Sequence, residues 1–265
     1  MAFGTLGDEV KMKLDLNEIA TNESIIAAEL QIGDLLCELE GYDFGFAEQV
    51  QRSLPPTELR VFADADYSQA DREFTLSNFR KLGQFPNSYG VIDALWGLEF
   101  SGNSLSSDLE ALASGLMDRP MRLRTERAVA QDSQTHMVGY VYPEAEKIGP
   151  GLENLDRFLR GIEMGEGRFH QAVIAWIFLM RLHPFDDGNG RTSRAFFNFA
   201  CRDLGLISSP TFFLSTIVYS NLDTLAYDHL DRDPIGAVQV YLKLIVTYLE
   251  IVHSSFIVDE SAPPE

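Results

Sequence analysis

A helix-length run of apolar residues that ends at a histidine before a proline constrains this sequence most. Residues 169–180 read Phe-His-Gln-Ala-Val-Ile-Ala-Trp-Ile-Phe-Leu-Met. A helix that is apolar on nearly every face is stable only in the centre of a domain. Because Pro184 disfavours the α conformation in the residue before it, the helix is expected to end near His183. The sequence therefore predicts a buried helix that delivers a histidine to the loop that follows.

That loop is rich in glycine and leads directly into a second helix. Residues 183–194 read His-Pro-Phe-Asp-Asp-Gly-Asn-Gly-Arg-Thr-Ser-Arg. Backbone N–H groups of such a loop and helix start point outward together and form an anion site. Gly188 and Gly190 allow a phosphate to approach the backbone closely. Arg191 and Arg194, three residues apart on one helix face, are placed to bind further phosphate oxygens.

An acidic side chain and a histidine complete the chemistry of this segment. Asp187 would be repelled by a polyphosphate unless a divalent cation lay between them, so we expect it to bind Mg²⁺. His183, at the edge of the loop, is placed to take a proton from an attacking hydroxyl. The residues alone therefore predict phosphoryl or nucleotidyl transfer from a nucleoside triphosphate to a hydroxyl.

Helical periodicity dominates the rest of the chain, and no linker rich in proline, glycine or serine divides it. The strand signal with alternating Val and Tyr lies in residues 135–150, where we expect a small hairpin. The sequence thus predicts one mostly α domain. The expected helices cover residues 17–39, 46–54, 67–82, 91–100, 105–117, 152–160, 168–182, 192–204, 220–230 and 234–252.

Composition excludes several classes of protein. The 265 residues carry a net charge of -19, which repels nucleic acid as a whole. Two cysteines, Cys37 and Cys201, are too few for a disulfide framework. The first 16 residues lack the pattern of a signal peptide, and the run 172–180 is about half of the ~20 residues that a membrane span needs. We therefore expect a cytoplasmic protein without nucleic-acid or membrane partners.

Residues 183–194 resemble the signature of the Fic family, His-Pro-Phe-x-Asp-Gly-Asn-Gly-Arg-x-x-Arg, and agree with it at every specified position. The resemblance implies an all-α fold with a β-hairpin flap, here near 135–150, on which a target protein docks. It also implies transfer of AMP from ATP, with Mg²⁺, to a serine, threonine or tyrosine hydroxyl of that target.

Carried over by position, the resemblance assigns a role to each residue of the signature. His183 would be the general base, and Asp187 would hold Mg²⁺ against the phosphates. Pro184 and Phe185 would be structural, with Phe185 packed inward, and Asp186 falls on the variable position. The implied phosphate-binding residues are Gly188, Asn189, Gly190, Arg191 and Arg194. Beyond the signature, Tyr219 resembles the tyrosine that borders the adenine.

The resemblance also suggests how the chain is organised. A Fic domain is expected over residues 91–252, preceded by a helical extension, 1–90, packed on the core. Residues 253–265 are expected to form a frayed tail.

A regulatory element of the family is degenerate here. Many members carry the inhibitory pattern Ser/Thr-x-x-x-Glu-Gly/Asn, whose glutamate pairs with the second arginine of the signature. In the corresponding segment the serine or threonine position is Gly97 and the glutamate position is Ser101, while Gly102 fits the pattern. We favour loss of this inhibition over a shifted role for Glu99, because two residues along a helix point to nearly opposite faces. An inhibitory partner protein is the family's other solution.

Other activities stay open at this stage. A relative that transfers phosphate itself has lysine at the position of Gly190 and alanine at that of Gly188, so this sequence favours AMP transfer. Transfer of another nucleotide or phosphate-containing group, hydrolysis of a nucleotide, and an inhibited nucleotide-binding interaction module are the alternatives.

Overall fold

The computed structural model describes residues 15–45, 88–97, 105–131, 138–162, 166–212 and 233–260. This part of the chain is helical except for two short strands and its loops, so the predicted all-α fold is confirmed. The helices are α1 (Leu16–Thr21), α2 (Glu23–Glu38), α6 (Ser88–Leu95), α7 (Leu105–Met117), α8 (Ile148–Arg160), α9 (Phe169–Leu182), α10 (Asn189–Asp203) and α13 (Pro234–Glu260). The predicted helices 46–54, 67–82 and 220–230 lie outside the described residues.

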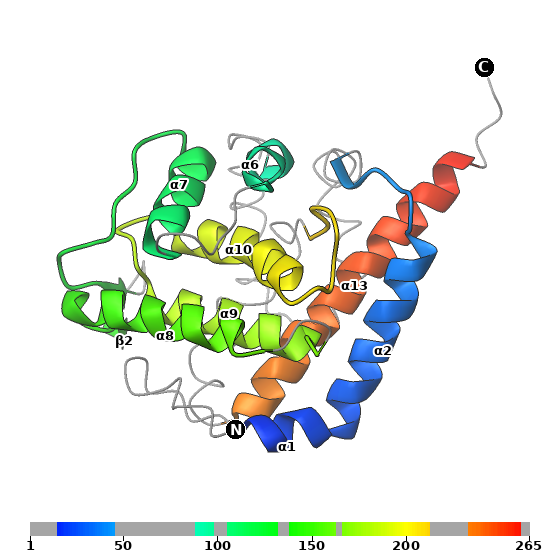
Figure 1. Cartoon of the computed structure of the whole chain (residues 1–265), viewed down its shortest axis with the longest axis horizontal. Coiled ribbons are helices and arrows are strands. Elements are labelled where there is room, and N and C mark those ends of the chain that lie inside the picture. Colours follow the sequence, from blue (N-terminus) through cyan, green and yellow to red (C-terminus); the bar gives the residue numbers. More distant parts are fainter. Residues whose placement is uncertain are drawn as a thin grey trace.

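Helix α9 lies at the centre of the molecule, as its apolar sequence predicts. Twelve of its 14 residues are buried. Helices α8, α10 and α13 pack around it (Figure 1). Trp176 of α9 contacts Phe197 of α10 and Tyr241 of α13, with ring centroids 5.4 and 4.6 Å apart. The loop at the end of α9 is therefore attached to the buried, closely packed centre of the fold.

The N-terminal segment forms two helices where the sequence predicts one. Asn22 ends α1 and begins α2, and its Oδ1 accepts hydrogen bonds from the N–H groups of Ser24 and Ile25. Asp15 caps α1, so this helix begins one residue before the expected start at residue 17. An asparagine within a periodic run competes for backbone groups, and here that competition breaks the helix.

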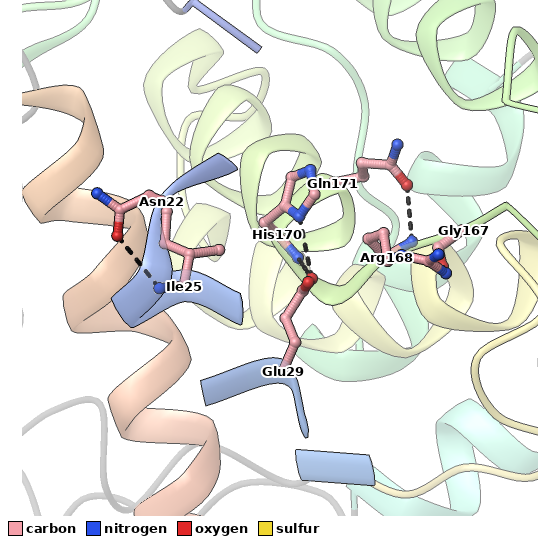
Figure 2. Close-up of polar contacts among 7 residues, drawn as sticks. All are labelled: Asn22, Ile25, Glu29, Gly167, Arg168, His170 and Gln171. Carbon is pink, nitrogen blue, oxygen red and sulfur yellow. Dashed lines mark hydrogen bonds and ion pairs between the residues drawn. The ribbon is translucent and has the colours of Figure 1, made fainter. Parts of the chain in front are cut away.

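Helix α2 packs along α13 and reaches α9 (Figure 1). At the latter contact, Oε1 of Glu29 accepts hydrogen bonds from the backbone N–H of His170, at 2.9 Å, and pairs with its Nδ1, at 3.0 Å (Figure 2). His170 is thus a satisfied core histidine at the start of α9. The N-terminal helices cover the core, while the predicted domain boundary at residue 90 stays a prediction.

Helix α13 is longer than the sequence indicates. It continues to Glu260, and Phe256 is buried in the core. The expected helix end at residue 252 is therefore wrong, and so is the expected fraying of residues 253–260. Its segment Pro234–Ser254 has the length and the mean hydropathy, 1.6, of a membrane span, yet 61% of that window is buried inside the fold. Core helices of globular domains share these properties.

The two strands, β1 (Val129–Gln131) and β2 (Val138–Val141), pair antiparallel. The register shifts between Ala130 and Gln131, which is the sign of a β-bulge. The expected span of 135–150 is wrong at both ends, because β1 precedes it and a 3-10 turn (Ala145–Lys147) and α8 fill its second half. Pro150 lies in the first turn of α8, a position that suits proline because the first N–H groups of a helix have no partner within it. The role of the pair as a flap stays a prediction.

Candidate active site

The end of α9 presents His183 in an unusual backbone conformation. His183 is the C-cap, with φ 50° and ψ 60°, and its N–H donates to the carbonyl of Leu179 at 3.1 Å. This left-handed region is uncommon for a residue other than glycine. The helix therefore ends where Pro184 predicts, and the chain turns sharply away from the helix axis at the candidate base.

The side chain of Asn189 closes the loop that follows. Its Oδ1 accepts a hydrogen bond from the N–H of Phe185 at 2.9 Å, and its Nδ2 donates to the carbonyl of Phe185 at 2.7 Å. Asn189 is 4% exposed and Phe185 is fully buried. Phe185 thus packs inward as predicted. The side-chain amide of Asn189 thus holds the loop, while its backbone N–H, at the start of α10, is available to the predicted anion site.

Helix α10 begins at Asn189, three residues before the predicted start at Thr192. Gly188 is its N-cap, with φ 78°, and a Cβ there would lie 2.7 Å from Sδ of Met117. Only glycine satisfies both constraints. The first N–H groups of a helix have no partner within it, so Asn189 and Gly190 offer donors at this end. The N–H of Gly188 itself donates to Oδ1 of Asp187 at 2.7 Å.

The two signature arginines lie on the first turns of α10. Arg194 is 8% exposed and Arg191 is half-buried. A Cβ on Gly190 would lie 3.1 Å from Nη1 of Arg194, so that guanidinium lies beside the start of the helix. The fold thus brings a cationic side chain to the helix end where the N–H groups converge.

Asp187 projects toward solvent and forms an ion pair. Its Oδ2 lies 2.8 Å from Nη2 of Arg119, and both side chains are more than half exposed. Within the described ranges no group of three or more His, Cys, Asp or Glu side chains is placed to hold a metal ion. One accessible carboxylate beside a phosphate site is nevertheless the donor set that Mg²⁺ uses when phosphates and water supply its other ligands.

The imidazole of His183 is largely shielded from water. It stacks on the ring of Tyr142, with centroids 3.6 Å apart and planes at 17°. Burial, together with the nearby charge of Arg124, lowers the pKa of His183 to about 4, against a smaller opposing effect of the Met180 carbonyl. Nδ1 is buried and has no hydrogen-bond partner of standard geometry in the described part of the chain. At neutral pH the ring is uncharged and able to accept a proton.

Two residues of this site were missed by the sequence analysis. Nε of Arg124 donates a hydrogen bond to the carbonyl of His183, and the ring of Tyr142 covers the ring of His183. Arg124 lies in a segment without a motif. Tyr142 lies in the predicted hairpin region, 135–150, for which the sequence predicts strands and a docking edge but no contact with His183. No pattern in the sequence indicates either contact, because each arises only when the chain is folded.

Other predicted site residues lie outside the described ranges or away from the loop. Tyr219, Ser101 and Gly102 are outside the described residues. Gly97 is exposed in the turn after α6. The predicted adenine and inhibitory contacts therefore stay predictions.

Comparison with known proteins decides the family. Residues 106–201, which include the loop from His183 to Arg194, match the sequence model of the Fic/DOC family. This part of the chain belongs to the Fic/DOC family. Members of this family transfer nucleotidyl or other phosphate-containing groups, usually to proteins. No curated protein sequence matches the chain.

Two solved structures are similar to this chain to different degrees. A Fic family protein from Desulfovibrio desulfuricans G20 is 14% identical, with a TM-score of 0.54 over 91% of this chain and 77% of that one. Fic-1 (residues 134–508) from C. elegans is 16% identical over 96% of this chain and 69% of that one, with a TM-score of 0.38. At this identity the first comparison supports the fold, and the second is too distant to argue from.

Proposed function

We propose that this Fic domain is a protein adenylyltransferase that transfers AMP from ATP, with Mg²⁺, to a serine, threonine or tyrosine hydroxyl of a target protein. The observation that carries the proposal is one short loop with a neutral, shielded His183 at its start and the N-terminus of α10 at its end. The first is suited to accept a proton, and the second to bind a phosphate.

In the proposed reaction the hydroxyl oxygen of the target attacks the α-phosphorus of ATP. The new bond joins that oxygen to phosphorus, the bond from the α-phosphorus to the bridging oxygen breaks, and pyrophosphate leaves. The hydroxyl proton passes to the ring of His183. The N–H groups of Asn189 and Gly190 would bind the transferred phosphate, and Arg191 and Arg194 the leaving pyrophosphate.

Asp187 is the residue that would hold Mg²⁺. When bound, the ion would neutralise charge on the phosphates. Its carboxylate would first have to leave Arg119, and because both side chains are exposed that pair is worth about 1 kcal/mol or less. Arg119 is then left beside the phosphates as a further cation.

The target is proposed to dock on the edge of the β1–β2 pair by adding an extended strand. Val129 and Val141 face each other in this pair and are 38% and 43% exposed. Tyr142, directly after Val141, stacks on His183. A hydroxyl on a peptide bound along this edge would therefore approach the base.

The test uses the purified chain, Mg²⁺ and ATP labelled on either the α- or the γ-phosphate, with and without cell lysate proteins. We expect α-label on protein and none with His183→Ala, while the matched variant His253→Ala, on α13, labels as the unchanged protein does. Transfer of γ-label would establish phosphate transfer instead. Absence of both labels despite ATP binding would favour an inhibited nucleotide-binding module.

A further inference from the structure

A buried arginine outside the family signature is bound to the end of α9. Arg124 lies between α7 and β1 and is only 3% exposed, although it carries a charge. Its Nε donates to the carbonyl of His183 at 2.6 Å, and its backbone N–H donates to the carbonyl of Pro184 at 2.8 Å. Burying a cation is costly unless its donors are satisfied, so these bonds are needed for the fold as well.

The same guanidinium also reaches the segment that follows β2. Its Nη2 donates to the carbonyl of Pro143 at 2.5 Å and, more weakly, to that of Leu182 at 3.4 Å. Its Nη1 donates to the carbonyl of Glu126 at 2.7 Å. Arg124 therefore joins the last turn of α9 to both flanks of the strand pair.

The acceptors on α9 are groups that a helix leaves without partners. The last carbonyls of a helix, here including Leu182, have no N–H to accept from, and a cation at this end is favourable. His183 follows with φ 50°, a conformation that persists only where its surroundings hold it. Its carbonyl is held by Arg124, while its ring is held by Tyr142, the neighbour of Pro143.

Resting on the proposed transfer reaction, we propose that Arg124 is a positioning residue that fixes the His183 imidazole relative to the β1–β2 pair. One side chain holds both the turn that presents the base and the flank of the strands on which the target would dock. The base and the docking edge are thereby kept at a fixed separation. The groups proposed to bind phosphate lie on α10, beyond the Phe185–Asn189 hydrogen bonds, so they do not depend on Arg124 in this way.

Because Arg124 holds the turn of His183 but not the phosphate-binding groups, its variants should affect the first and not the second. In Arg124→Gln the forked donor and the charge are lost, and in Arg124→Lys the charge is kept but one ammonium cannot reach both sides. The matched control is Arg122→Gln, two residues earlier, whose exposed guanidinium pairs with Glu110. Thermal unfolding identifies which variants are folded, and Arg124→Lys replaces Arg124→Gln if the latter does not fold.

Two measurements are made on the full chain. The first is the initial rate of self-labelling from α-labelled ATP over a range of ATP concentrations. We expect a maximal rate reduced about ten- to hundredfold, as for a displaced catalytic group, at an unchanged half-saturating ATP concentration. The second is the pH titration of the His183 ring by NMR in histidine-labelled protein, with the signal assigned by its loss in His183→Ala. We expect Arg124→Gln to raise the pKa of His183 and Arg124→Lys to raise it less, while both displace its ring resonances.

The titration needs no transfer activity, so it separates this inference from the proposed function. If the unchanged protein labels nothing, the proposed function fails and the ring resonances alone decide the role of Arg124. A folded Arg124 variant with unchanged His183 resonances, or with an unchanged maximal rate where labelling occurs, would overturn the inference. Arg122→Gln must match the unchanged protein in both measurements, and a parallel loss there would overturn it too.

Discussion

At His183, different neighbours constrain the backbone and the ring. Pro184 and the carbonyl contacts of Arg124 govern the turn, and Tyr142 covers the imidazole. Because the ring is largely buried beside a cation, the folded protein prefers its neutral form. His183, the candidate base, is thus held in the form that can accept a proton, although the same burial makes it a weak base.

This preference predicts a pH dependence of stability. The pKa of His183 is about 4 in the folded chain, against 6.5 for the free residue. Between these values the unfolded chain binds more protons, so the free energy of unfolding falls as the pH is lowered. From pH 7 to pH 5 this contribution falls by about 2 kcal/mol at most. Urea denaturation should show a smaller fall over that range for His183→Gln than for the unchanged chain, and equal falls would contradict the buried, neutral ring.

The ion pair between Arg119 and Asp187 leads to a second prediction. Because its guanidinium pairs with Asp187, Arg119 would compete with the proposed Mg²⁺ for that carboxylate. Arg119→Ala should lower the Mg²⁺ concentration needed for half-maximal labelling by a few-fold at most, since exposed pairs are worth about 1 kcal/mol or less. Arg122→Ala, which removes the neighbouring pair with Glu110, should not change it. A higher Mg²⁺ requirement in Arg119→Ala would contradict competition between Arg119 and Mg²⁺ for Asp187.

At the scale of elements, the accuracy of the sequence-based predictions follows the strength of each local signal. The start of helix α9 was predicted within one residue. A nearly all-apolar run that ends at His-Pro is stable only as a buried helix that ends there. Helix α7 also agrees, with Leu105–Met117 in both. The start of α10 was missed because Gly188 caps it with a positive φ, which a glycine-rich loop conceals.

The contact between α2 and α9 could not be predicted from the sequence. Nothing in the local pattern of Glu29 indicates that it reaches the start of α9, 141 residues away. Burial works to raise the pKa of Glu29, but its hydrogen bonds with His170 outweigh this and lower it. The carboxylate is thereby retained between α2 and α9 (Figure 2).

The Glu29 contact predicts how α2 stabilises the fold. Glu29→Ala leaves the backbone N–H and the ring of His170 without their acceptor, so it should lower the free energy of unfolding by about 1–3 kcal/mol. The control is Glu38→Ala, whose side chain on the same helix is 58% exposed. Urea denaturation at pH 7 compares them, and equal stabilities of the two variants would contradict a structural role for the Glu29–His170 pair.

The degenerate inhibitory segment, residues 97–102, leads to a further prediction. The double variant Gly97→Ser/Ser101→Glu, with Gly102 already present, completes the family's inhibitory pattern. If inhibition has been lost through these positions, the added glutamate should pair with Arg194 and lower the self-labelling rate, by about five- to hundredfold for a typical coupling. The control is Gly97→Ser/Ser101→Gln, which lacks the charge. Equal rates in the two variants would show that this segment no longer reaches the site.

For the whole molecule, the charge distribution contrasts with the chemistry of the site. The chain carries a net charge of -19, yet Arg119, Arg124, Arg191 and Arg194 lie around one loop. A cluster of cations within an acidic protein is suited to attract a small polyanion at short range. The signature indicated Arg191 and Arg194, but only the fold brings Arg119 and Arg124 beside them.

Packing explains why residues far apart in sequence serve one loop. Helix α9 is enclosed by α8, α10 and α13, and α2 covers α13 from outside (Figure 1). The end of α9 is thus held from several sides, and small displacements of the base are resisted by a close-packed core.

The central claim is that this loop transfers AMP, and the mass added to a protein tests it most directly. After incubation of the chain with ATP and Mg²⁺, fragmentation mass spectrometry of the modified peptides gives both the added mass and the residue that carries it. We predict the mass of one AMP on a serine, threonine or tyrosine side chain, and no addition in His183→Ala. The mass of a single phosphate group, or AMP addition that persists in folded His183→Ala, would contradict the account.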